Sequence, residues 1–94
     1  MSAIIEYIKD KRILILGFGR EGKSTYNYIR KHLPEKELTV GDMNKPQIDD
    51  GNVSLIYGDD YLKHLGDFDI VFKSPGIAFL EDNMHPETTE ITCQ

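Results

Sequence analysis

The sequence RILILGFGREG, residues 12–22, decides the fold of this chain. Its aliphatic run, residues 12–16, is typical of a strand that is buried on both faces of a parallel sheet. A Gly-x-Gly-x-x-Gly motif follows directly, and residues 21–33 then place apolar side chains at helical spacing, with Pro34 just beyond as a stop. A strand, a glycine turn and a helix in this order indicate the first unit of a nucleotide-binding fold.

Four further strand-like runs extend this unit into a sheet. We expect an α/β fold, a Rossmann-like parallel sheet with flanking helices, because short connections between alternating strands and helices require parallel strands. The sequence stops after the last expected strand without a helix to cover it, which indicates that residues 1–94 are a single truncated domain. The expected strands are 12–16, 38–40, 53–57, 69–73 and 90–93, and the expected helices are 3–9, 21–33, a short 59–65 and an irregular 81–89.

Size and composition restrict the class of protein. A chain of 94 residues can bury one core but is short for a complete dinucleotide-binding enzyme. No apolar run approaches the ~20 residues that span a bilayer. The N-terminus has no secretory signal, and the single cysteine, Cys93, agrees with a reducing cytoplasm. The net charge of −5 argues against nucleic acid as a partner, although backbone N–H groups could still bind one phosphorylated small molecule.

The glycine motif forms the first of three loops at the carboxyl ends of the strands, where ligands bind in such sheets. Gly17 permits a tight turn, Gly19 lets a diphosphate approach the backbone, and Gly22 lets the helix pack near the strand. The N–H groups of Arg20, Glu21 and Gly22 then point at the anion, assisted by the helix dipole. A glycine turn that serves packing alone is the alternative.

The second loop begins at Asp42, about 20 residues after Gly22, as expected for an acidic residue at the tip of the second strand. Its carboxylate can accept hydrogen bonds from ribose hydroxyls or from a base N–H. Met43 and Asn44 extend over the same crevice and could supply an apolar wall and an amide. The alternative is an Asp that caps a turn with Asn44.

The third loop, Lys73-Ser74-Pro75-Gly76-Ile77, follows the fourth strand. Pro75 fixes φ and Gly76 permits a positive φ, so the chain leaves the strand sharply with backbone groups exposed. These groups are expected opposite the glycine turn. A plain turn explains the Pro-Gly pair equally well.

No combination of residues indicates catalysis or a metal site. The three histidines are scattered, and the sequence has no Cys–His pair, serine nucleophile motif or metal-ligand spacing. The adjacent carboxylates Asp49–Asp50 and Asp59–Asp60 are interpreted as solvated loop residues. We therefore expect this chain to bind a ligand without transforming it.

The three loops together resemble the N-terminal domain of the Mur ligases, most closely the branch that adds D-glutamate in peptidoglycan synthesis. The resemblance rests on Gly17-x-Gly19-x-x-Gly22, on the Asp at the tip of the second strand, and on the Ser-Pro-Gly-Ile element after the fourth. The last of these is the most discriminating, since many folds share the glycine motif. The similarity covers nearly all of the chain but only the first of the family's three domains.

The resemblance implies that this domain binds the uridine diphosphate part of UDP-N-acetylmuramoyl-L-alanine in place of a nicotinamide cofactor. The backbone of Arg20 and Glu21 would contact the diphosphate. Two sets of residues would line the rest of the nucleotide: Asp42, Met43 and Asn44 the uracil and the ribose, and Pro75, Gly76 and Ile77 the uracil.

ATP, Mg²⁺ and the catalytic groups would belong to the other domains of such a ligase, so the fragment alone would be inactive and without a cofactor. We expect a cytoplasmic monomer with no membrane partner. Two alternatives stay open: an NAD-binding regulatory domain of a potassium channel or transporter, and the cofactor half of a dehydrogenase. A regulatory NAD domain has no particular need of the Ser-Pro-Gly-Ile element, and a dehydrogenase would continue into a substrate domain with a catalytic His or Lys.

Overall fold

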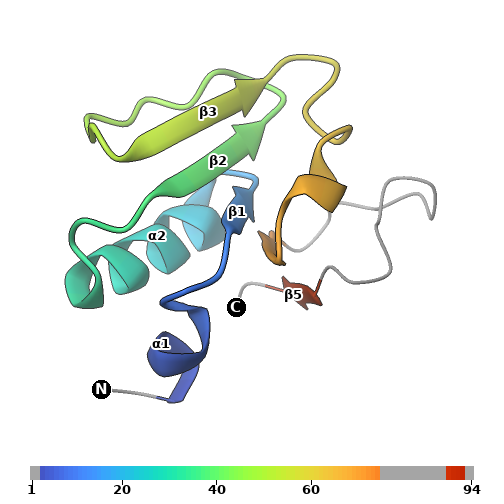
Figure 1. Cartoon of the computed structure of the whole chain (residues 1–94). Helices are drawn as coiled ribbons and strands as arrows, with labels where there is room; N and C mark the ends of the chain where they lie inside the picture. The colour runs from blue at the N-terminus through green and yellow to red at the C-terminus, as the bar shows by residue number, and fades with distance from the viewer. Residues whose placement is uncertain (1–2, 75–88, 93–94) are drawn as a thin grey trace.

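Parallel strands form the sheet of this protein, whose computed structural model describes residues 3–74 and 89–92 (Figure 1). The chain passes from the central strand to one side of the sheet and later returns to the other side, in the order β3-β2-β1-β4-β5. This arrangement confirms the expected Rossmann-like fold. The strands are β1 (Ile13–Leu16), β2 (Leu38–Asp42), β3 (Val53–Tyr57), β4 (Ile70–Lys73) and β5 (Thr89–Thr92), and the helices α1 (Ala3–Ile8), α2 (Arg20–His32) and the 3₁₀ helix η1 (Leu65–Asp67).

The central strand β1 is buried along its whole length, as its uninterrupted aliphatic sequence predicts. It pairs with β2 on one side and with β4 on the other, and Leu14 lies opposite both Thr39 and Val71. Successive side chains of a strand point to opposite faces of the sheet, so each face of β1 needs its own apolar cover.

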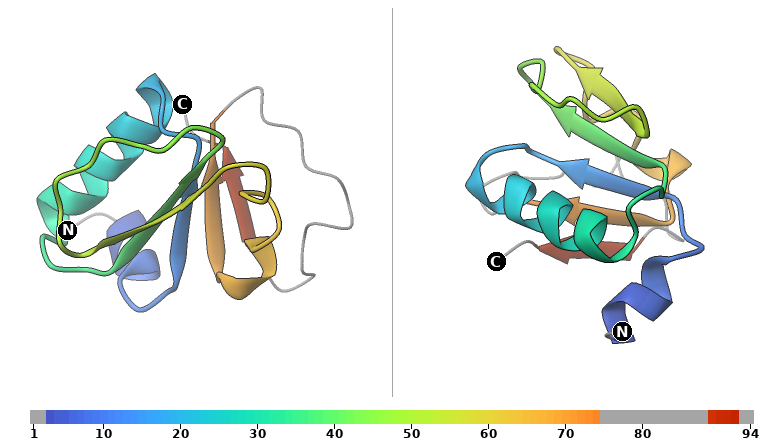
Figure 2. Two further views of the ribbon diagram at one scale, coloured as in Figure 1. Left: turned by 90° about the horizontal axis from the view of Figure 1, so that it is seen from above. Right: turned by 90° about the vertical axis from the view of Figure 1, so that its left-hand side faces the viewer.

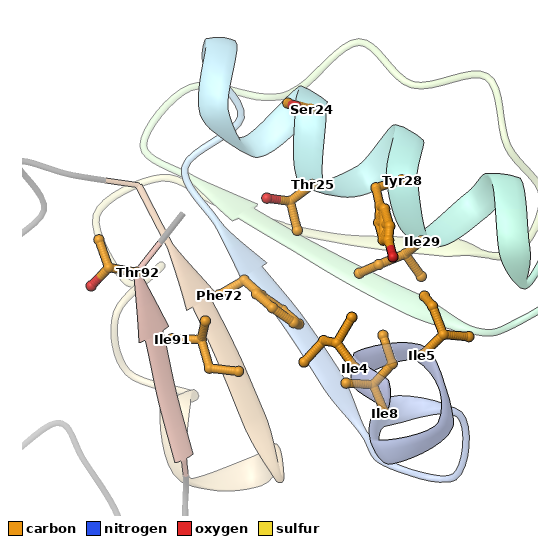
Figure 3. Close-up of a pocket in the computed structure, with 10 residues that line it drawn as sticks. All are labelled: Ile4, Ile5, Ile8, Ser24, Thr25, Tyr28, Ile29, Phe72, Ile91 and Thr92. Carbon is orange, nitrogen blue, oxygen red and sulfur yellow. The ribbon is translucent and has the colours of Figure 1, made fainter. Parts of the chain in front are cut away.

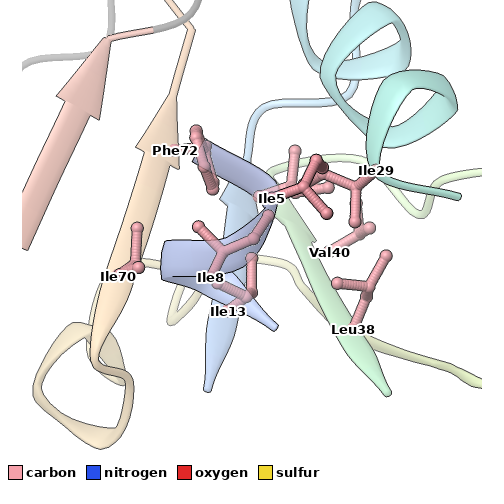
Figure 4. Packing of buried hydrophobic residues seen from close by; sticks show 9 residues of the cluster. Ile5, Ile8, Ile13, Ile29, Leu38, Val40, Ile70 and Phe72 are labelled. Atoms are coloured by element: carbon pink, nitrogen blue, oxygen red, sulfur yellow. The ribbon is translucent and has the colours of Figure 1, made fainter. Parts of the chain in front are cut away.

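Helices α1 and α2 cover one face of the sheet, and the segment that contains η1 covers the other (Figure 2). Ile5 and Ile8 of α1 and Ile29 of α2 pack against aliphatic residues of β1, β2 and β4 (Figure 4). On the opposite face, Leu65 of η1 belongs to a smaller cluster with side chains of β1 and β4. None of the helices in the described ranges has the length and apolar character that crossing a bilayer requires.

The expected short helix over residues 59–65 is wrong. The segment is a series of turns that ends in η1, and its N–H groups bond to carbonyls three residues earlier, as from Tyr61 to Gly58 and from Lys63 to Asp60. So few residues cannot offset the cost of nucleating an α-helix, and packing of the apolar side chains against the sheet decides the conformation instead.

The other elements lie where they were predicted, with ends shifted by one or two residues. Strand β2 continues through Gly41 and Asp42, because both pair in register with Ile56 and Tyr57 of β3. Strand β5 begins at Thr89, which was expected at the end of an irregular helix. The rest of that expected helix, residues 81–88, and Cys93 lie outside the described residues.

Candidate functional site

The glycine turn connects β1 to α2 at the carboxyl edge of the sheet (Figure 1). Gly17 has a φ of 88°, in the left-handed region that favours glycine. Its N–H donates to the carbonyl of Gly41 at 2.7 Å, which joins the turn to the end of β2. The turn is therefore fixed at its first residue by backbone geometry alone.

The other two glycines of the motif lie in opposite surroundings. A Cβ placed on Gly22 would lie 1.9 Å from the carbonyl oxygen of Gly17, so only glycine lets α2 approach the turn this closely. A Cβ placed on Gly19 would have no heavy atom of the described residues within 4 Å. Packing of these residues therefore explains Gly22 but does not explain Gly19.

The N-terminus of α2 presents backbone donors beside the open space at Gly19. Gly19 is the N-cap residue, and its carbonyl accepts the hydrogen bond of the first helical turn from Lys23 at 2.9 Å. The described residues supply no acceptor to the N–H groups of Arg20, Glu21 and Gly22. Such a helix end favours an anion, because its donors and the helix dipole point the same way.

The carboxylate of Asp42 holds the glycine turn to the loop after β2. One carboxylate oxygen accepts the Phe18 N–H at 2.7 Å, and the other accepts the Asn44 N–H at 3.3 Å. The second contact is the turn cap that the sequence offered as an alternative for Asp42. The carbonyl of Met43 in turn accepts the N–H of Gly58, so the loops after β1, β2 and β3 are linked.

Residues 43–50, here called the strap, run from the end of β2 across the glycine turn. A cleft of about 290 Å³ opens between the strap and the turn, and a second cleft of about 250 Å³ adjoins it along α2. Both are lined by Phe18, Lys23 and Gln47, and Lys45 lies at the first with its ammonium group 5.7 Å from the centre of the Tyr57 ring. The first cleft thus combines apolar side chains, two cations and the carboxylate of Asp42 beside the N-terminal turn of α2.

The far end of the strap is fastened to α2 by Tyr26, Arg30 and Asp50, here called the latch. Asp50 accepts hydrogen bonds from the Tyr26 hydroxyl at 2.5 Å and from Arg30 Nε at 2.9 Å. The side chains of Arg30 and Asp50 are only 15% and 13% exposed. Hydrogen bonds from Tyr26 and from the Asn52 N–H lower the pKa of Asp50, whereas burial and the bond to Asp50 raise the pKa of Tyr26.

The third predicted loop begins beside the glycine turn. Ser74 donates its N–H to the carbonyl of Leu16 at 3.0 Å and its hydroxyl to the carbonyl of Gly17 at 3.3 Å. Lys73, the residue before it, pairs with Leu16 across the strands and forms an ion pair with Glu90 at 3.3 Å. The predicted site residues Pro75, Gly76 and Ile77 lie outside the described residues.

A larger cavity, of about 600 Å³, lies away from this edge, between α1, α2, β4 and β5 (Figure 3). Its lining is mostly aliphatic and aromatic, with Ile4, Tyr28, Phe72 and Ile91 around the opening. None of the described residues that line it carries a charge that could bind a phosphate. In the described ranges no three His, Cys, Asp or Glu side chains are arranged to hold a metal ion.

The structure brings the first two predicted loops together at one cleft. The glycine turn and the N-terminus of α2 form one wall, and Asp42 and Asn44 form part of the other, while Met43 is 47% exposed beside them. The interpretation of Asp50 as a solvated loop residue is wrong, since its carboxylate is bonded within the latch. The only local signal for this was the spacing of Asp50 and Asn52, which suits a side chain that caps its own turn.

Curated proteins of similar sequence all belong to one group of enzymes. The chain is 33% identical over 78 residues, 79% of its length, to the UDP-N-acetylmuramoyl-L-alanine–L-glutamate ligase of Xanthomonas axonopodis pv. citri. It is 30% identical over 80 residues, 77% of its length, to the UDP-N-acetylmuramoylalanine–D-glutamate ligase of Clostridium kluyveri. A third match, 29% identical over 83 residues or 81% of its length, is the D-glutamate ligase of Ligilactobacillus salivarius. No protein-family model matches the chain.

The matched region is a small part of each relative. It covers 17% of the Xanthomonas and Clostridium enzymes and 18% of the Ligilactobacillus enzyme. It includes most of this chain, and the expectation drawn from the glycine motif, Asp42 and the Ser-Pro-Gly-Ile element agrees with the names of these relatives. The chain therefore belongs to the Mur ligase family.

Proposed function

We propose that this domain binds the uridine diphosphate part of UDP-N-acetylmuramoyl-L-alanine for a ligase that adds D-glutamate in peptidoglycan synthesis. The open space at Gly19, beside the uncapped N-terminus of α2, carries this proposal. The relatives support it, because the names of both the D-glutamate and the L-glutamate ligases contain UDP-N-acetylmuramoyl-alanine.

The diphosphate is bound by backbone donors in this proposal. The described residues supply no acceptor to the N–H groups of Arg20, Glu21 and Gly22, and a Cβ at residue 19 would meet no described atom within 4 Å, so there is room for an anion at this end of α2. Binding through the backbone also fits a protein with a net charge of −5 and a carboxylate at residue 21. Lys23 and Lys45 offset part of that negative charge at the cleft.

The ribose and the uracil lie against the strap. Asp42 uses its carboxylate to hold Phe18 and Asn44, yet an ionised carboxylate has about four acceptor positions, so two remain for ribose hydroxyls or a base N–H. Met43 and the side chain of Asn44 are exposed and supply an apolar contact and an amide. Pro75, Gly76 and Ile77 complete the uracil pocket.

The chain binds this substrate without converting it. The ligase reaction also requires ATP and Mg²⁺. The family resemblance assigns both to other domains of the enzyme. The domain holds the substrate by its nucleotide end while the reaction takes place elsewhere on the substrate.

Titration calorimetry of the 94-residue chain with UDP, UMP and NAD tests this function. We expect UDP to bind weakly and more tightly than UMP, because the second phosphate reaches the helix N-terminus, and we expect no binding of NAD. Gly19→Ala should lower UDP affinity at least about tenfold, equivalent to about 1.4 kcal/mol, and Gly19→Val should abolish binding.

Gly51→Ala is the matched control, since a Cβ there also has no described atom within 4 Å but lies away from the cleft. It should bind UDP like the wild type. Tight binding of NAD with none of UDP would replace the ligase function with the regulatory or dehydrogenase alternative. Unchanged UDP affinity in a folded Gly19→Val variant would show that the turn is not the anion site.

A further inference from the structure

Tyr26 lies where α2 meets both walls of the candidate site. Its ring contacts the ring of Phe18 in the glycine turn edge-on, with the ring centres 5.8 Å apart and the planes at 75°. Its hydroxyl donates to Asp50 at the end of the strap. The Tyr26 side chain therefore contacts both walls of the cleft: the glycine turn at the N-terminus of α2, and the strap, which includes Asn44.

Two carboxylates hold the strap near its two ends, and the Met43 carbonyl accepts a further hydrogen bond from the Gly58 N–H. At its start, Asp42 bonds to the Phe18 and Asn44 N–H groups. At its end, Asp50 is bonded by Tyr26, Arg30 and Asn52. The position of the strap relative to the glycine turn depends on these two carboxylates, on buried Pro46 and on Ile48, which packs against the core; the other side chains between the carboxylates are exposed.

The latch is partly shielded from water, which makes its geometry well defined. Arg30 Nη1 donates to the carbonyls of Leu33 and Lys36 at 2.9 and 2.8 Å, so the guanidinium is fixed to the chain that follows α2. It also lies 5.6 Å from the centre of the Tyr26 ring. A change at Tyr26 therefore affects the strap and the turn, while Arg30 keeps its own anchors on the chain that follows α2.

We propose that Tyr26 is a positioning residue for the nucleotide: it sets the width of the cleft by holding the strap and the glycine turn at a fixed distance. This inference rests on the proposed function, since the cleft is taken to hold the ribose and the uracil. Tyr26 does not contact the ligand in this role. The hydroxyl acts through Asp50 and the strap, and the ring acts through Phe18.

Tyr26→Phe separates these two effects because it removes the hydroxyl and keeps the ring. We expect it to lower UDP affinity about three- to tenfold, the factor by which the fraction of chains with a correctly placed strap falls. Tyr26→Leu also removes the contact with Phe18 and should cost more. Tyr28→Phe is the matched control, since Tyr28 lies on the same helix but lines the apolar groove of Figure 3.

The location of the amides whose UDP response changes distinguishes a loss of strap positioning from a general loss of stability. In NMR spectra of the folded Tyr26→Phe variant, UDP should still shift the amides of Arg20, Glu21 and Gly22, and its effect on Asn44 should be reduced. Backbone order parameters of the strap should fall in the free variant and stay unchanged in Tyr28→Phe.

The binding results distinguish a failure of the proposed function from a failure of the role proposed for Tyr26. If the wild type binds no UDP, the proposed function fails and this inference fails with it. If the wild type binds UDP and Tyr26→Phe binds it equally well with the same amide shifts, the inference alone is overturned. Reduced affinity with an equal loss of shifts at all site amides would also contradict positioning by the strap.

Discussion

Gly19 and Gly22 belong to one motif but serve different physical needs. At Gly22 the missing Cβ makes room for the carbonyl of Gly17, which is part of the protein itself. At Gly19 the missing Cβ leaves space that no described residue fills. The sequence shows only that both are glycine, whereas the structure separates a packing position from a candidate ligand position.

This difference gives a prediction about stability at single residues. Gly22→Ala should lower the free energy of unfolding by about 3 kcal/mol or more, because the new methyl group forces the backbone of the turn to move. Gly19→Ala should cost about 1 kcal/mol at most, the usual difference between glycine and alanine at an N-cap. Urea denaturation of both variants measures this directly. A Gly19→Ala variant as unstable as Gly22→Ala would mean that Gly19 is also a packing position.

Site residues could be predicted from the sequence where the backbone geometry requires a particular residue type. Gly17, Gly22 and Asp42 follow from the geometry of a strand–turn–helix unit, so their spacing indicates their places. Asp50 was not predictable in this way. Its partners Tyr26 and Arg30 lie 24 and 20 positions away along the chain, and only the fold brings them together.

Helix α2 connects the parts of the site at the scale of elements. Its N-terminus presents backbone donors, Ile29 packs against the sheet, and Tyr26 and Arg30 hold the end of the strap. Each function uses a different face or end of one helix of 13 residues. A conformational change in α2 would therefore also change the cleft.

The attachment of the strap to α2 should depend on pH. Hydrogen bonds in the folded state lower the pKa of Asp50 below its ordinary value of 3.8, so the ionised carboxylate stabilises the fold above that pH. Asp50→Asn should lower the free energy of unfolding at pH 7 by about 1.5–3 kcal/mol, the value of hydrogen bonds to a charged group. The difference from wild type should stay constant down to about pH 5 and shrink as the pH falls through 3.8 and below.

Asp49→Asn provides the control for this pH dependence, because it makes the same change of charge at the exposed neighbouring residue. Urea unfolding of both variants and the wild type from pH 7 to pH 3 measures the effect. If Asp50→Asn and Asp49→Asn differ from wild type equally at pH 7, the latch does not stabilise the protein.

Helices and strands were predicted best where the spacing of apolar residues in the sequence is most regular. Strand β3 has the expected bounds and β1 begins one residue later than expected, because short, mostly apolar runs between polar segments leave little choice. Residues 59–65 were wrongly predicted as a helix, because Tyr61, Leu62 and Leu65 have helical spacing. In the structure these side chains pack on the sheet from a series of turns. In so short a segment, tertiary contacts outweigh local preference.

The topology of the whole molecule gives the loops their common location. The order β3-β2-β1-β4-β5 places the switch in strand order between β1 and β4, so the glycine turn and the loop after β4 leave the sheet at the same edge. The loop after β2 joins them through Asp42. The sequence predicted this meeting because parallel strands fix the side of the sheet on which their loops lie.

Amide shifts in a ¹⁵N NMR titration of the 94-residue chain with UDP test the central claim most directly. We expect the largest shifts on the N–H groups of Arg20, Glu21 and Gly22, with smaller ones at Asp42, Asn44 and Gly76, and none of them with NAD. Shifts caused by NAD and not by UDP, or UDP shifts confined to the apolar groove around Tyr28, would contradict it.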